Sequence, residues 1–113
     1  MAQLSATNTR VTLQTAAVTG ASADYFYGAG STYGNANKAL QATVTGTGAV
    51  TATVAIQVSM DNVNWLTAGT ITLSGTTSAS DGFVLSAAPW QYIRSNVTAL
   101  TGTGASVTVL MGL

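Results

Sequence analysis

The chain has 113 residues, a length that favours a single domain, and only 5% of them are charged, against about 25% in ordinary soluble domains. Because 47% of the residues are hydrophobic but no run approaches the ~20 apolar residues of a membrane helix, the composition excludes a disordered chain and a membrane span. Three basic and three acidic residues, without histidine or cysteine, exclude a nucleic-acid-binding stripe and a disulfide framework.

The low charge also indicates how the surface is used. A formal net charge of zero gives copies of the chain no mutual repulsion to keep them apart. The surface must therefore consist of Thr, Ser, Asn, Gln and small apolar residues, which suits packing against copies or a partner. We expect a homo-oligomer or a repetitive assembly. The alternative is a secreted domain that tolerates low charge.

The first third of the chain contains two predicted strands. Residues 1–9 form a small, polar N-terminal arm that becomes ordered only if a partner docks it. Arg10–Val18 alternates between apolar and polar residues, as a strand does. Asp24–Tyr27 is a short aromatic strand, and a loop rich in Gly, Ser and Asn follows at residues 28–37. The domain itself is expected to span residues 10–113.

The strongest strand pattern lies in the middle of the chain. Lys38–Thr45 and Val50–Ser59 both alternate with a period of two, which is typical of half-buried antiparallel strands. Between them, the TGTGA segment at Thr45–Ala49 predicts a tight turn, because glycine adopts positive φ without a Cβ penalty. The residues predicted to face the core are Leu40, Ala42, Val44, Val50, Ala52, Val54, Ile56 and Val58.

The C-terminal half is predicted to hold the remaining strands. They are Trp65–Leu73, Asp81–Leu85, Trp90–Ala99 and Ser106–Met111. Gly69 marks a bulge, Ser74–Ser80 is a polar loop, and Thr101–Ala105 repeats the TGTGA turn. No segment holds a helical period. About eight strands at this spacing predict an all-β fold, an antiparallel β-sandwich.

Chemistry-bearing residues are few and scattered. The three aspartates lie on three separate segments, so no pair of catalytic carboxylates is predicted, and we expect neither an enzyme nor a cofactor. Asp61–Asn64, with the sequence DNVN, superficially resembles a calcium loop but lacks the further acidic positions and the closing Glu. We interpret it as a capped β-turn without a metal, because Asp and Asn bond their own backbone.

Aromatic residues supply the candidate contacts with a partner. Tyr25, Tyr27 and Tyr33 lie among Gly, Ser and Asn, as in recognition surfaces, although they could also fill the core. Trp65 and Trp90 border strand ends, where tryptophans commonly close a sandwich, which we favour over a sugar-stacking platform. The predicted contact residues are Leu4, Tyr25, Tyr27, Tyr33, Trp90 and Arg94.

Arg94 is a lone charge on a predicted strand. Such an arginine is usually paired, and Asp61 and Asp81 are the expected partners within the chain. The functional alternative is a salt bridge between subunits.

Two short motifs carry a family resemblance. Ser59–Trp65, SMDNVNW, resembles the S-x-D-G-x-x-W turn of discoidin-type, galactose-binding-like jelly rolls, with Asn62 in place of the usual glycine. Tyr92–Arg94 resembles their Y-[VI]-R strand. The resemblance implies a jelly-roll-like sandwich in which Asp61, Asn64 and Trp65 hold a hairpin turn and do not contact sugar.

The combination of these two motifs is also similar to that in small β-sandwich proteins of tailed-phage virions. Those proteins are likewise rich in Thr, Gly, Ala and Val and poor in charge. This resemblance implies a head decoration (cement) protein or a tail component. We expect a decoration protein that binds the major capsid protein or another virion protein as a homo-oligomer, with a trimer favoured. Its location would be the virion, assembled in the host cytoplasm. The alternative is a carbohydrate-binding module of a tail fibre or adhesin, which binds a glycan through Trp65, Trp90 or Tyr33.

Overall fold

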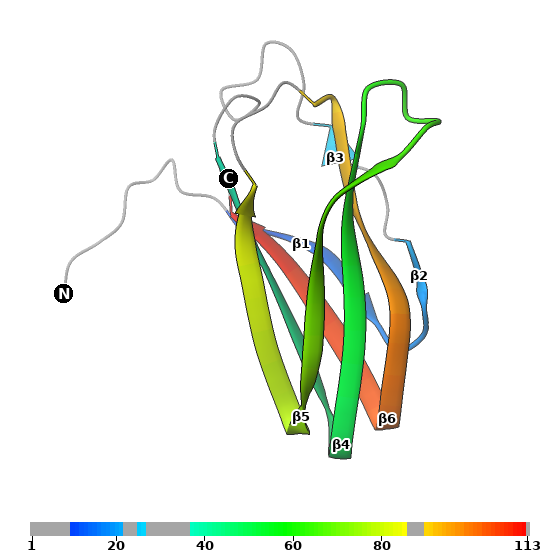
Figure 1. Ribbon diagram of the computed structural model, residues 1–113, viewed down its shortest axis with the longest axis vertical. Coiled ribbons are helices and arrows are strands. Elements are labelled where there is room, and N and C mark those ends of the chain that lie inside the picture. The colour runs from blue at the N-terminus through cyan, green and yellow to red at the C-terminus, as the bar shows by residue number, and fades with distance from the viewer. Residues whose placement is uncertain (1–9, 22–24, 27–36, 86–89, 113) are drawn as a thin grey trace, which may run out of the picture.

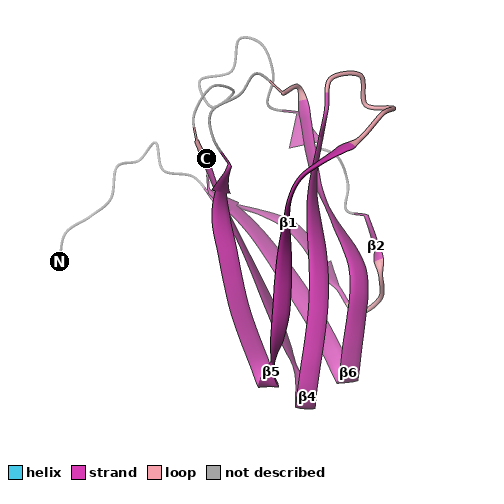
Figure 2. Cartoon of the chain, in the orientation of Figure 1, coloured by secondary structure: helices cyan, strands magenta, loops and turns pink. Residues whose placement is uncertain are grey.

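The computed structural model describes residues 10–21, 25–26, 37–85 and 90–112, which form six β-strands in one antiparallel sheet (Figures 1 and 2). The strands are β1 (Arg10–Ala16), β2 (Gly20–Ala21), β3 (Tyr25–Phe26), β4 (Lys38–Ser59), β5 (Leu66–Leu85) and β6 (Tyr92–Gly112). The prediction of an all-β, antiparallel fold is confirmed. Within the described residues no helix is long and apolar enough to cross a membrane.

The three long strands are bent, and each contributes to both halves of the sheet. The first half-sheet contains residues 38–45 of β4, 78–85 of β5 and 106–112 of β6; the second contains residues 49–59, 66–76 and 92–101 of the same strands. In Figure 1 the long strands turn back at the bottom of the view, so that the two half-sheets lie over one another. Strand β4 is central and pairs with β5 on one side and β6 on the other.

The bends lie at the glycine-rich segments. Gly48 and Gly104, the fourth residues of the two TGTGA motifs, have φ of 72° and 62°, and in β5 the positive φ falls on Thr77, at 63°. The pairing register shifts between Thr45 and Ala49. Because glycine adopts positive φ without a Cβ penalty, the strand can change direction there and continue.

The predicted hairpin turns at TGTGA are therefore wrong. In a tight hairpin the two flanking strands pair with each other, whereas here both flanks of Thr45–Ala49 pair with β5 and β6. The predicted loop Ser74–Ser80 is likewise part of β5. The count of about eight strands is wrong for the same reason: three pairs of predicted strands are three continuous strands, and β2 forms where a turn was predicted.

The two edges of the sheet differ. At one edge, β1 pairs with the part of β6 in the first half-sheet, and β2 and β3 pair with the part of β6 in the second. The N-terminal strands thus follow the bend of β6 in three short pieces. On the opposite side, β5 pairs with β4 alone among the described strands.

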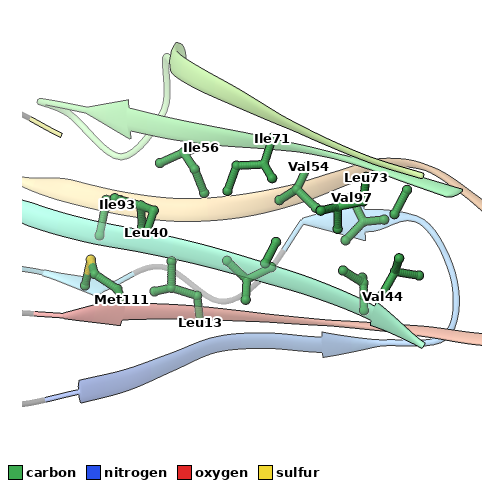
Figure 3. Packing of buried hydrophobic residues seen from close by; sticks show 14 of the residues in the cluster. Leu13, Leu40, Val44, Val54, Ile56, Ile71, Leu73, Ile93, Val97 and Met111 are labelled. Atoms are coloured by element: carbon green, nitrogen blue, oxygen red, sulfur yellow. The ribbon is translucent and has the colours of Figure 1, made fainter. Parts of the chain in front are cut away.

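The hydrophobic core lies between the half-sheets (Figure 3). All eight residues of β4 predicted to face the core are buried, from Leu40 in the first half-sheet to Val58 in the second. Two contacts join the layers directly: the Phe83 ring lies against the Gly69 backbone, and Ser95 Oγ donates a hydrogen bond to Gln14 Oε1 at 2.8 Å. The bulge predicted at Gly69 is confirmed by the register shift opposite Ile56.

Candidate functional site: the Asp61 turn and the Trp65–Arg94 stack

The connection between β4 and β5 is held by the carboxylate of Asp61. Asp61 Oδ1 accepts hydrogen bonds from the backbone nitrogens of Asn64 (2.8 Å) and Val63 (2.9 Å) and from Ser59 Oγ (3.0 Å). Asp61 Oδ2 accepts one from Asn64 Nδ2 at 2.8 Å. Both carboxylate oxygens therefore have partners inside the turn.

Ser59 and Asn62 complete the turn. The buried Ser59 hydroxyl accepts hydrogen bonds from the backbone nitrogens of Asn62 (2.9 Å) and Asp61 (3.2 Å). Asn62 has a φ of 59°, the left-handed conformation that asparagine tolerates better than most residues. This explains how Asn62 can stand where the resembling family has glycine. Next to the turn, Gln91 N donates to Ser59 O at 3.2 Å, which ties the start of β6 to the end of β4.

Hydrogen bonding sets the charge state of this turn. The backbone N–H groups of Asn64 and Val63, followed by the side chains of Asn64 and Ser59, hold the pKa of Asp61 well below its usual range. The carboxylate is thus ionised and hydrogen-bonded to residues of its own turn. No group of three His, Cys, Asp or Glu side chains within the described residues could hold a metal ion.

The turn should make stability depend on pH in the acid range. Because the folded-state pKa of Asp61 lies below the unfolded value of about 3.9, its stabilisation is present above that pH and is lost as the pH falls towards the folded-state pKa. We expect Asp61→Asn to have a lower free energy of unfolding than the wild type at pH 7. The difference between the two proteins should be smaller at about pH 2.5. Urea unfolding at both pH values measures this difference.

A matched control is Asp81→Asn, which removes a carboxylate that accepts one backbone hydrogen bond, from Gly82 N at 2.8 Å. At pH 7 this variant should lose less stability than Asp61→Asn, because one hydrogen bond to a carboxylate is removed and not four. Equal losses for the two variants would contradict the role assigned to the Asp61 turn.

Trp65, which follows the turn, lies across the outer face of the second half-sheet. The guanidinium carbon of Arg94 is 4.2 Å from the centroid of the Trp65 ring, a cation–π stack. Arg94 Nε also donates to Gln57 Oε1 at 2.7 Å, because Arg94 and Gln57 are cross-strand neighbours on β6 and β4. The stack therefore fixes the guanidinium on the sheet surface.

The expected ion pair of Arg94 with Asp61 or Asp81 is not what the structure shows. Asp61 is occupied by its own turn, and Arg94 stacks on Trp65 and bonds Gln57 instead. Sequence reasoning missed Gln57, which signals its role only through the register of β4 and β6.

The other tryptophan, Trp90, is half-buried and packs against the hydrophobic core. Packing of Trp90 against the core agrees with the interpretation that a tryptophan at a strand end closes the sandwich.

Lys38 was not singled out from the sequence, yet it is only 1% exposed, and burial lowers the pKa of its ammonium group. The sequence did contain a signal for this burial, because Lys38 is two residues before Leu40 and so shares its inward face of β4.

Several predicted contact residues cannot be compared with the structure. Leu4, Tyr27 and Tyr33 lie outside the described residues, as does the arm at residues 1–9. The backbone of Tyr25 pairs with Ile93 of β6, and its side chain is likewise outside the description.

The outward surface of both half-sheets is dominated by hydroxyl side chains. Thr43 and Ser80 share a hydrogen bond of 2.7 Å between β4 and β5, and Thr51 and Thr101 are hydrogen-bonded between β4 and β6. Arg94 is the one charged side chain that the described strands of the second half-sheet place on this surface. The Trp65–Arg94 stack is thus a fixed arginine on the hydroxyl-rich outer face of the second half-sheet.

No protein-family model, curated protein or solved structure matches this chain.

Proposed function

We propose that this chain is a structural protein of a phage virion: a decoration (cement) protein that binds the outer surface of the head as a homo-oligomer and stabilises it. The observation that carries the proposal is the hydroxyl-rich, nearly uncharged outer surface of the two half-sheets. Among the residues whose side chains the structure describes, the charges outside the core are those of Asp61, Asp81 and Arg94, because Lys38 is buried. Such a surface can be covered by a partner with little desolvation of charge.

We further propose that the bent sheet is a small, jelly-roll-like β-sandwich of the kind that the resemblance implies. A single core between two half-sheets supports this classification, since sandwiches pack two sheets face to face over one core. The hydrogen-bonded turn Ser59–Trp65 supports it too, because it contains the Asp, Asn and Trp of the resembling motif in contact with one another or with β6.

Two contributions would stabilise a head: the surface area buried against the partner, and an ion pair made by the fixed guanidinium of Arg94. The partner, the major capsid protein or another virion protein, would cover Thr and Ser side chains. The methyl groups of the threonines would be buried, and the hydroxyls of both residue types would find acceptors. Arg94 is held in place by Trp65 and Gln57, so little side-chain entropy is lost when it meets a carboxylate of the partner. The arm at residues 1–9 and the segment Tyr25–Tyr33 would add contacts.

The carbohydrate-binding alternative receives less support from the tryptophans. One face of the Trp65 ring is covered by Arg94, and Trp90 packs against the core. A sugar-stacking platform needs an aromatic face that is free to receive the sugar ring.

The proposal is tested on heads assembled with and without this protein. We expect the protein to co-sediment with heads, and heads that lack it to melt at a lower temperature. Arg94→Glu should weaken co-sedimentation more than Arg94→Lys, since the first reverses the charge that meets the partner and the second keeps it. Heads with unchanged melting and no bound protein would overturn the proposal. Glycan-array binding that is lost in Trp90→Ala would favour the alternative.

A further inference from the structure

Strand β5 forms one edge of the described sheet, and this edge runs through both half-sheets. Among the described residues, the 20 residues of β5 pair with β4 on one side and with no strand on the other. Natural proteins protect such edges with Lys, Pro or a covering segment, because unpaired N–H and C=O groups invite pairing with another chain. β5 contains no Lys, Arg or Pro, and Asp81 is its single charged residue.

The chain itself shows how a bent strand pairs with another bent strand. β4 and β5 are antiparallel along both half-sheets, from Lys38↔Leu85 through Thr45↔Ser78 and Ala49↔Thr76 to Val58↔Leu66. The bends of the two strands coincide. The part of β4 that comes first in the sequence therefore pairs with the part of β5 that comes last.

We propose that two copies of this chain pair antiparallel through their β5 edges, around a two-fold axis at the β5 bend near Thr76. This inference rests on the proposed function, whose homo-oligomer it specifies. The two-fold axis passes through the bend and places the second half-sheet of one copy beside the first half-sheet of the other. Residues 66–76 of one copy therefore meet residues 78–85 of its partner. The arrangement repeats the β4–β5 geometry and continues both layers across the contact. Both copies contribute the same strand, so the interface is isologous.

Charge and apolar exposure on β5 are compatible with this contact. Residues 66–76 contain no charge, so Asp81 of each copy lies beside an uncharged segment of its partner. Leu66 and Val84, 56% and 65% exposed, lie at the two ends of β5. Antiparallel pairing brings Leu66 of one copy and Val84 of the other to the same end of the joint sheet, where their apolar surface can be covered.

Light scattering on the full chain and a single cysteine test this contact. We expect a mass of twice 11.3 kDa. The chain has no cysteine, so Thr76→Cys provides a single thiol, and oxidation should give a disulfide-linked dimer because the two Thr76 positions meet at the axis. Thr103→Cys is the matched control: it is an exposed threonine at the bend of β6, and its copies would be about five strand spacings, roughly 24 Å, apart.

A charge at the axis gives a second test. Thr76→Lys opposes two ammonium groups and should raise the dimer dissociation constant about tenfold or more, whereas Thr103→Lys adds the same charge away from the edge and should leave it unchanged. Circular dichroism establishes that both variants are folded. A monomer, a trimer, or equal cross-linking of both cysteine variants would overturn the β5 contact. A β5 dimer that does not bind heads would instead overturn the proposed function.

Discussion

Gly82→Ala should lower the free energy of unfolding by about 3 kcal/mol or more, the largest loss expected from an added methyl group at any of the described glycines. A Cβ at residue 82 would overlap the carbonyl oxygen of Leu40 and lie 3.2 Å from the Cα of Gln41. These are backbone atoms of β4, directly opposite Gly82 in the sheet. They cannot move aside without breaking the β4–β5 pairing in the first half-sheet.

Gly112→Ala is the matched control for this prediction. It adds the same methyl group to β6, where its nearest neighbour would be the Cβ of Ala39 at 3.7 Å, an ordinary contact. We expect a change within about 1 kcal/mol, since the gain from a less flexible unfolded chain offsets small packing losses. Urea unfolding of both variants measures the difference, and comparable losses would contradict the close approach of β5 to β4.

Gly46→Ala and Val50→Ala should each destabilise the protein, and the double variant should lose less than the sum. A Cβ at residue 46 would lie 2.8 Å from Val50 Cγ1, and Val50 is fully buried. Overpacking should cost about 1–3 kcal/mol, and loss of the valine methyl groups about 2 kcal/mol. In the double variant the added methyl group enters space that Val50 has left, so we expect a favourable coupling of about 1 kcal/mol.

The control for this cycle is Gly48→Ala in the same motif. A Cβ at residue 48 would meet no heavy atom within 4 Å, so its cost comes from the φ of 72° alone, about 1 kcal/mol. Combined with Val50→Ala, this cost should add without coupling. Coupling of equal size for Gly46 and Gly48 would show that Val50 does not pack into the bend.

Local patterns in the sequence predicted the inward face of the strands. The alternation from Val50 to Val58 determines which side chains share a face, and the five residues expected to face inward are buried. Ala55, expected on the opposite face, is buried as well. Continuity through the bends could not be predicted in this way. A TGTGA segment with positive φ fits both a hairpin turn and a bent strand, and the choice depends on which distant strands pair with its two flanks.

The candidate site divides along the same line. The Asp61–Asn64 interaction spans four consecutive residues, so the sequence alone indicates a capped turn. The stack of Arg94 on Trp65 joins β6 to the start of β5 across β4, and it depends on a register that no local pattern contains. The β5 edge was also unpredictable, because an edge is defined by strand order and not by the strand's own residues.

The shared bend of β4, β5 and β6 has a consequence for how the molecule folds and opens. Neither half-sheet is a continuous piece of chain, because each takes one part of all three strands. No half-sheet can therefore form first as an independent unit, and pairing between distant segments favours folding in milliseconds to seconds over faster times. Backbone amides of the two half-sheets should exchange with solvent in one cooperative opening, so the two layers share a single global stability.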